Sequence, residues 1–144
     1  NSIGYGASYN NSTHTGGNPN ADFIDNYGVH WDPIAQYARS RGRKADVKRG
    51  WSLSGIASEI NRGNPVIIYW YNGLSNQTRY SWHYNYGAKP GLHSVVVYGY
   101  KGDASNPTGF YVRDPWPSFY QIFYTSRSFL NKWSYFGYSA VVVK

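Results

Sequence analysis

The sequence has 144 residues and a mass of 16.4 kDa, the size of one domain able to bury a substantial core. It contains no cysteine, so disulfide bonds, thiolate metal sites and a cysteine nucleophile are excluded from these residues. The net charge is +7, and no apolar run approaches the roughly 20 residues that a membrane-spanning helix needs.

The surface must be built largely from uncharged residues. Charged residues make up 15% of the chain, against about 25% in an average domain, whereas aromatic residues make up 19%. This composition and the lack of cysteine are typical of proteins exported by bacteria, so we expect an extracellular or cell-wall-associated protein. The chain starts at Asn1 and not at a methionine, and we expect it to be processed or to be part of a longer protein.

The first part of the chain is predicted to be a loop followed by a helix. Residues 1–20 are rich in glycine, asparagine, serine and threonine, so we expect a flexible or loop segment there and a single domain over residues 21–144. A helix is predicted over residues 33–41, with Asp32 as its N-cap. The basic stretch Arg39–Arg49 is predicted to be a solvated loop, with an anion site as the alternative.

A second helix and a buried strand are predicted next. Ser52 is suited to cap a helix whose apolar residues recur at helical spacing, and Gly63 is suited to end it. The β-branched run Val66–Tyr71 is too short for a helix and predicts a buried strand. The aromatic and polar stretch Leu74–Gly91 predicts a long loop that packs as a hairpin or lines a groove.

The remaining residues predict strands with one helix inserted late. The strands are expected at His93–Tyr100, Gly109–Asp114, Phe119–Tyr124 and Tyr138–Val143. Thr125 or Ser126 is suited to cap the helix that precedes the last strand. This order of elements predicts an α+β fold with a mostly antiparallel sheet.

One of the four histidines is well placed for proton transfer. His93 opens an apolar strand, where its imidazole would be held on rigid sheet, and Asp114 ends the next strand. Antiparallel neighbours would bring the two side chains together, so that Asp114 orients the imidazole of His93. The alternative is structural: Asp114 begins an Asp-Pro turn and His93 caps a strand end. Structural or incidental roles are expected for the other three, His14, His30 and His83.

The sequence predicts no metal or cofactor site. It has no cysteine ligands, no His-Glu-x-x-His helix, and a single glutamate, Glu59. Glycine-rich phosphate-binding loops are also missing from the sequence.

Several segments resemble the second half of a papain-like cysteine peptidase domain. They are Gly91–Tyr100, Val112–Trp116 and the late Phe129…Trp133…Gly137…Ala140–Val142, and earlier pieces from Asn18 onward resemble the same domain in the same order. The family is number thirty-nine of the cysteine peptidases, in its secreted, stand-alone branch, which is similar to the bacteriocin-processing peptidases. The resemblance implies a mostly antiparallel sheet with helices packed on one side.

The resemblance also implies a division of catalytic roles. In this family, a cysteine at the N-terminus of the first helix is the nucleophile, a glutamine upstream of it helps to form the oxyanion hole, and a histidine and an aspartate complete the triad. Carried over by motif, His93 is the general base and Asp114 its orienting partner, while the cysteine helix would lie before Asn1. The upstream hydroxyls of Ser2, Ser8 and Ser12 are unsuited to replace the cysteine, because no amphipathic helix positions them.

Two functions are consistent with these observations. The first is hydrolysis of peptide or amide bonds by a Cys-His-Asp mechanism, with a peptide or protein as substrate, cell-wall peptides among them, and no activity in this chain alone. The alternative is an inactive peptidase-like module that binds peptides or cell-wall glycans. In either case Trp82, in the aromatic loop, and Trp116 are predicted to contact the ligand. A nucleic-acid partner is not expected, because the positive charge comes without a recognised binding motif.

Overall fold

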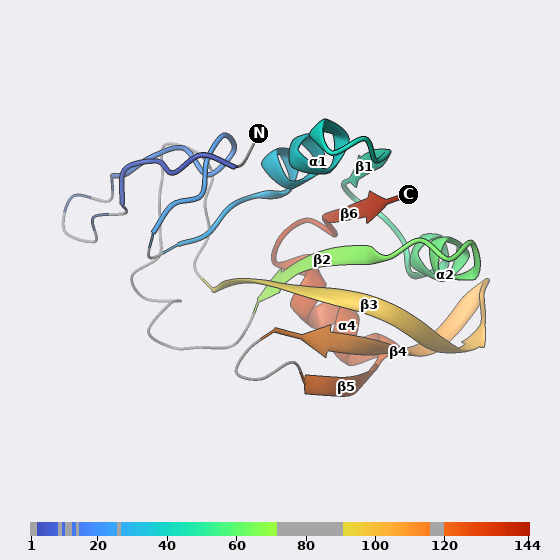
Figure 1. Cartoon of the computed structure of the whole chain (residues 1–144). Helices are drawn as coiled ribbons and strands as arrows, with labels where there is room; N and C mark the ends of the chain where they lie inside the picture. Colours follow the sequence, from blue (N-terminus) through green and yellow to red (C-terminus); the bar gives the residue numbers. More distant parts are fainter. Residues whose placement is uncertain are drawn as a thin grey trace.

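The computed structural model describes residues 3–8, 10, 13, 15–25, 27–71, 91–115 and 120–144 (Figure 1). In chain order its elements are α1 (Trp31–Ser40), β1 (Ala45–Lys48), α2 (Leu53–Asn61), β2 (Val66–Tyr71), β3 (Leu92–Asp103), β4 (Asn106–Asp114), β5 (Tyr120–Thr125), α4 (Ser126–Ser134) and β6 (Ala140–Val143). The described residues before α1 form isolated bridges, such as Tyr5 with Phe23, in place of regular elements.

A single six-stranded sheet organises the described part of the chain. The strand order is β1-β6-β2-β3-β4-β5, and every pairing is antiparallel. Strand β2 pairs with β3 along its whole length, from Val66 opposite Val97 to Tyr71 opposite Leu92. Strands β3, β4 and β5 form the predicted meander, so the predicted α+β class with a mostly antiparallel sheet is confirmed.

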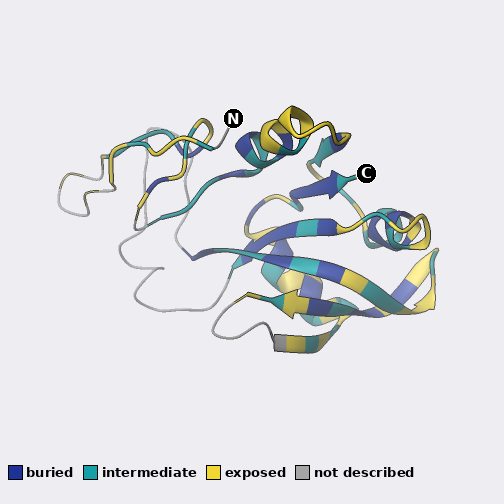
Figure 2. Cartoon of the chain, viewed as in Figure 1, coloured by how far each residue is buried: buried dark blue, intermediate teal, exposed yellow. Residues whose placement is uncertain are grey.

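One face of the sheet is covered by α2 and α4 (Figure 1). Trp70 of β2 packs edge-on against Phe129 of α4, whose ring also contacts Trp133 and Phe110. All four side chains are buried, and Figure 2 shows the same burial along the central strands. Burial of a large aromatic side chain contributes about 1.5–3 kcal/mol, so this cluster is the main source of stability on this face.

The other face carries α1. Its Ala35 packs in a second cluster with Tyr69 of β2 and Val141 of β6, residues whose neighbours in sequence point to the first face. The expectation that the helices pack on one side is therefore wrong for α1, because β2 and β6 carry apolar side chains on both faces of the sheet.

The helix ends agree with the sequence at two of three sites. The hydroxyl groups of Ser52 and Thr125 accept hydrogen bonds from the backbone N–H groups of Gly55 and Ser128, as predicted for N-caps. The predicted Asp32 cap is wrong, because α1 already begins at Trp31 and Asp32 lies in its first turn.

Strand β1 lies where the sequence predicted a solvated loop. Its four residues pair with β6 from Ala45 opposite Val143 to Lys48 opposite Ala140. Arg39 of α1 holds the strand by donating two hydrogen bonds to the carbonyl oxygen of Ala45, at 3.0 and 2.7 Å. The charges of this strand fit its place at the edge of the sheet, where polar residues are tolerated.

Among the described helices, none is both long enough and apolar enough to cross a membrane.

Candidate active site

His93 is held at the end of the sheet. It is the second residue of β3 and lies opposite Trp70 of β2. Pairing with β2 fixes the backbone at His93, and 21% of its side chain is exposed to solvent. A partly exposed imidazole on a rigid strand is well placed to reach a bound molecule.

Asp114 is the last residue of β4 and lies within hydrogen-bonding distance of His93. The registers of β3 and β4 place Val96 opposite Arg113, so Asp114 falls beside the beginning of β3. The distance between Nε2 of His93 and Oδ1 of Asp114 is 2.7 Å, and the Asp114 side chain is 15% exposed. The structure thus brings together the two residues predicted to form a catalytic pair.

The hydrogen bond defines which nitrogen of the imidazole is available for chemistry. A carboxylate only accepts hydrogen bonds, so Nε2 of His93 is the donor and carries the proton. In neutral His93, Nδ1 then has a free lone pair, and no described residue donates a hydrogen bond to it. Nδ1 can therefore act as a base toward a group that approaches from outside the described residues.

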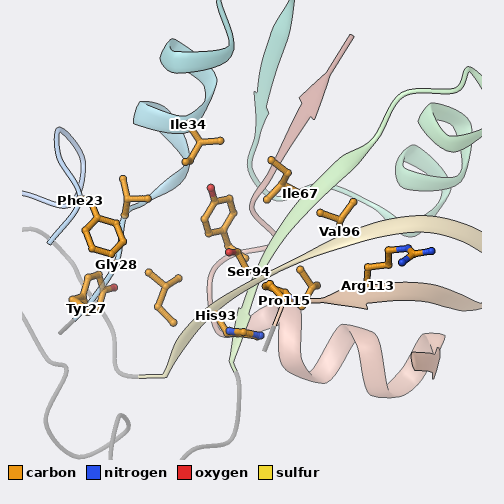
Figure 3. Close-up of a pocket in the computed structure, with 14 residues that line it drawn as sticks. Phe23, Tyr27, Gly28, Ile34, Ile67, His93, Ser94, Val96, Arg113 and Pro115 are labelled. Atoms are coloured by element: carbon orange, nitrogen blue, oxygen red, sulfur yellow. The ribbon is translucent and has the colours of Figure 1, made fainter. Parts of the chain in front are cut away.

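A cavity of about 540 Å³ is bordered in part by His93 (Figure 3). Phe23, Tyr27 and Gly28 border it from the segment before α1, and His93, Ser94 and Arg113 border it from the strands. The rest of its lining is mainly apolar and includes Val29, Ile34, Ile67, Leu92 and Val96. A pocket of this kind suits an apolar side chain with a polar group beside it.

Tyr69 brings a buried hydroxyl group to the same cavity. The residue is 2% exposed, and it lies opposite Ser94 of β3. Burial, followed by the nearby charge of Asp32, raises the pKa of Tyr69 above its ordinary value, so the phenol stays protonated. No described residue forms a hydrogen bond with its hydroxyl group, which is therefore available as a donor within the cavity.

His30 has the structural role that was expected for it, with partners on both ring nitrogens. Its Nε2 lies 2.9 Å from the hydroxyl oxygen of Tyr27, its Nδ1 lies 2.8 Å from Oδ1 of Asn20, and its ring stacks on Trp31. Burial lowers the pKa of His30 from 6.5 to about 4, against the opposing charge of Asp32, so the ring is neutral at pH 7.

The remaining predicted site residues lie outside the described residues. These are the proposed ligand contacts Trp82 and Trp116 and the histidines His14 and His83. The described residues contain no group of three histidine, aspartate or glutamate side chains suited to hold a metal ion.

Sequence reasoning missed the polar lining of the cavity. Tyr69 and Ser94 face each other because β2 and β3 pair in one register, and Arg113 joins them because it lies opposite Val96. The alternation of residues along Val66–Tyr71 was a usable signal, because it separates Tyr69 from the side chains that pack against α4.

Comparison with known proteins finds relatives of this chain and of its fold. The model of the Peptidase_C39 like family matches residues 2–141. A crystal structure of a C39-like peptidase candidate from Bacillus anthracis matches with a TM-score of 0.74 and 23% identity, over 99% of this chain and 75% of that chain. At this identity the structural match shows the fold alone. No curated protein matches the sequence.

Proposed function

Because the chain belongs to the Peptidase_C39 like family, we propose that it forms the histidine and aspartate part of a cysteine peptidase. His93 is the general base and Asp114 orients it, and the thiol comes from polypeptide outside these 144 residues, which contain no cysteine. The observation that carries the proposal is the 2.7 Å hydrogen bond between Asp114 and His93, which borders the cavity.

The reaction follows from the tautomer of His93. Nδ1 takes the proton of the thiol, and the sulfur attacks the carbonyl carbon of the substrate peptide bond. The C–N bond then breaks as Nδ1 gives the proton to the leaving amine, which leaves a thioester. Water hydrolyses the thioester, with His93 again taking and returning a proton, and the thiol is restored.

Asp114 supports both halves of this cycle. Its carboxylate keeps the proton on Nε2, which directs the lone pair of Nδ1 toward the thiol. It also stabilises the imidazolium that forms when Nδ1 is protonated. Because both side chains are largely sheltered from water, this attraction is screened less than that of an exposed pair.

The lining of the cavity supports a peptide as substrate. Its apolar walls fit an aliphatic or aromatic side chain, and the hydroxyl groups of Tyr69 and Ser94 can bind polar atoms of the peptide backbone. We propose cell-wall or other extracellular peptides as the class, on the basis of the composition of the chain.

Hydrolysis of a fluorogenic peptide library by the whole gene product tests this function. Replacing Asp114 by asparagine should lower kcat/KM about 100-fold, because the amide can present an N–H to Nε2 and favour the wrong tautomer. Asp46→Asn is the matched control, since Asp46 pairs with Lys144 on the surface, outside the cavity lining. Equal activity of the two variants would contradict the proposal.

A second function is favoured by one observation, the complete lack of cysteine in the 144 residues. If the gene product also lacks a cysteine close to His93, the domain would bind peptides in the cavity without cleaving them. The two functions are separated by the same library: binding without hydrolysis supports the module, and hydrolysis that depends on His93 supports the peptidase.

A further inference from the structure

Three aromatic rings form a row across β3, β4 and β5. Tyr98, Tyr111 and Phe123 come one from each strand, and we call them the aromatic row. The ring centroids of Tyr98 and Tyr111 lie 6.2 Å apart, and those of Tyr111 and Phe123 lie 5.1 Å apart. The row lies on the same face as the cavity, because Tyr111 is two residues from Arg113 on β4.

The row is open to solvent. Tyr98 is 42% exposed and Phe123 is 40% exposed, whereas the opposite face of β3 and β4 carries buried core residues. Figure 2 shows exposed residues recurring along β3, β4 and β5. Among the described helices, α2 and α4 pack on the opposite face and α1 packs against β1 and β6, so none of them covers the row. Contiguous exposed aromatic side chains mark an interaction site more often than isolated ones do.

Glycines in the adjoining strand hold two of the rings down on the sheet. A Cβ atom added to Gly109 would collide with the ring of Phe123 and come within 2.7 Å of the carbonyl oxygen of Tyr124. A Cβ atom added to Gly99 would come within 3.3 Å of the ring of Tyr111. The missing side chains of these two glycines therefore leave the rings room to pack closely against the neighbouring strand.

A cation lies over each end of the row. The guanidinium carbon of Arg113 is 5.4 Å from the centroid of the Tyr98 ring, and Nζ of Lys101 is 5.1 Å from the centroid of the Phe123 ring. Both side chains are exposed, and neither forms a salt bridge with a described residue. Their charges are thus available to an anionic partner, within a chain of net charge +7.

We propose that the aromatic row, with Arg113 and Lys101, binds a linear anionic polysaccharide. The negative face of an aromatic ring attracts the partly positive C–H groups of a sugar ring, and the two cations pair with acidic groups along the chain. Successive rings are tilted by 42° and 54°, so the row presents differently oriented rings to successive sugars of a chain.

The number of charges favours a polysaccharide over a nucleic acid. The site offers two cations for three rings, which fits a polymer with an acidic group on alternate sugars. A single-stranded nucleic acid carries a phosphate at every nucleotide and is usually met by a more continuous basic groove. This binding does not depend on the peptidase reaction, because the row uses neither His93 nor Asp114.

Calorimetric titration of the whole gene product with a hyaluronan decasaccharide tests the proposal, because this polymer carries a carboxylate on every second sugar. The Tyr98→Ala/Phe123→Ala variant should bind at least tenfold more weakly. The Lys101→Gln/Arg113→Gln variant should bind more weakly at low salt and show a flatter dependence of Kd on salt. The matched control is Tyr37→Ala/Arg41→Gln, an exposed tyrosine and arginine pair on and just after α1 with the same geometry.

Five outcomes would overturn the proposal. The first is retained binding in the Tyr98→Ala/Phe123→Ala variant. The other four are no binding of hyaluronan by the unaltered protein, equal loss of binding in the control variant, equal affinity for a neutral chitin oligosaccharide, and equal or tighter binding of oligo-dT or poly-glutamate that depends on the same rings. Far-ultraviolet circular dichroism of each variant establishes that a loss of binding is not a loss of fold.

Discussion

His93 and His30 show how one residue type takes different roles according to its surroundings. His93 binds Asp114 through Nε2, and its side chain stays partly exposed and borders the cavity. His30 has partners on both nitrogens and is buried between Tyr27 and Trp31. The first arrangement allows proton exchange with a bound molecule, whereas the second holds a segment in place.

The low pKa of His30 predicts a loss of stability in mild acid. Folding holds this histidine neutral down to a pKa of about 4, whereas in the unfolded chain it protonates near 6.5. Its contribution is therefore complete above pH 6.5 and falls as the pH drops from 6.5 to 4, by about 3 kcal/mol. Urea unfolding at pH 7 and 4.5 measures this change. In His30→Gln the difference between the two pH values should shrink, and an unchanged difference would contradict the assignment.

The sequence was most informative about the secondary structure elements. Strand β2 was predicted at its observed bounds, because its β-branched run lies between clear breaking residues. Strand β1 was missed, because four residues at a sheet edge, two of them charged, carry no pattern that separates them from a loop. Its pairing with β6 is decided by the tertiary structure, almost 100 residues further along the chain.

The Ser52 cap predicts a measurable contribution to α2. Its hydroxyl group accepts a hydrogen bond from the N–H of Gly55 at 3.1 Å. Replacing Ser52 by alanine leaves that donor without its partner and should lower the free energy of unfolding by about 1 kcal/mol. Ser58→Ala, at an exposed position inside the same helix, should change it by less than about 0.5 kcal/mol. Equal effects in chemical denaturation would show that the cap contributes nothing.

Gly109 predicts a larger effect on the β4 and β5 pair. Alanine there must displace the ring of Phe123 or the backbone at Tyr124, so the free energy of unfolding should fall by about 1–3 kcal/mol. Gly42→Ala is a poor control because of its positive φ, whereas Gly99→Ala has a looser contact and should cost less. Thermal unfolding of the two variants measures the order, and a smaller loss at Gly109 would contradict it.

On the scale of the whole molecule, the two faces of the sheet are covered to different extents. One face is closed by α2 and α4 over a core of aromatic and β-branched side chains, and the other is covered by α1 only in part. The cavity and the aromatic row both lie on that second face. The pair His93 and Asp114 could be predicted because each residue ends an obvious strand, but Tyr69 and Arg113 could not, because their place in the site depends on strand register.

The most direct test of the proposed peptidase is mass spectrometry of the whole gene product after treatment with a peptide-like, thiol-reactive electrophile. We predict that one cysteine outside these 144 residues is labelled, and that His93→Ala slows labelling at least about 100-fold while Asp46→Asn leaves it unchanged. A gene product with no labelled cysteine, or one labelled at the same rate with and without His93, would contradict the account.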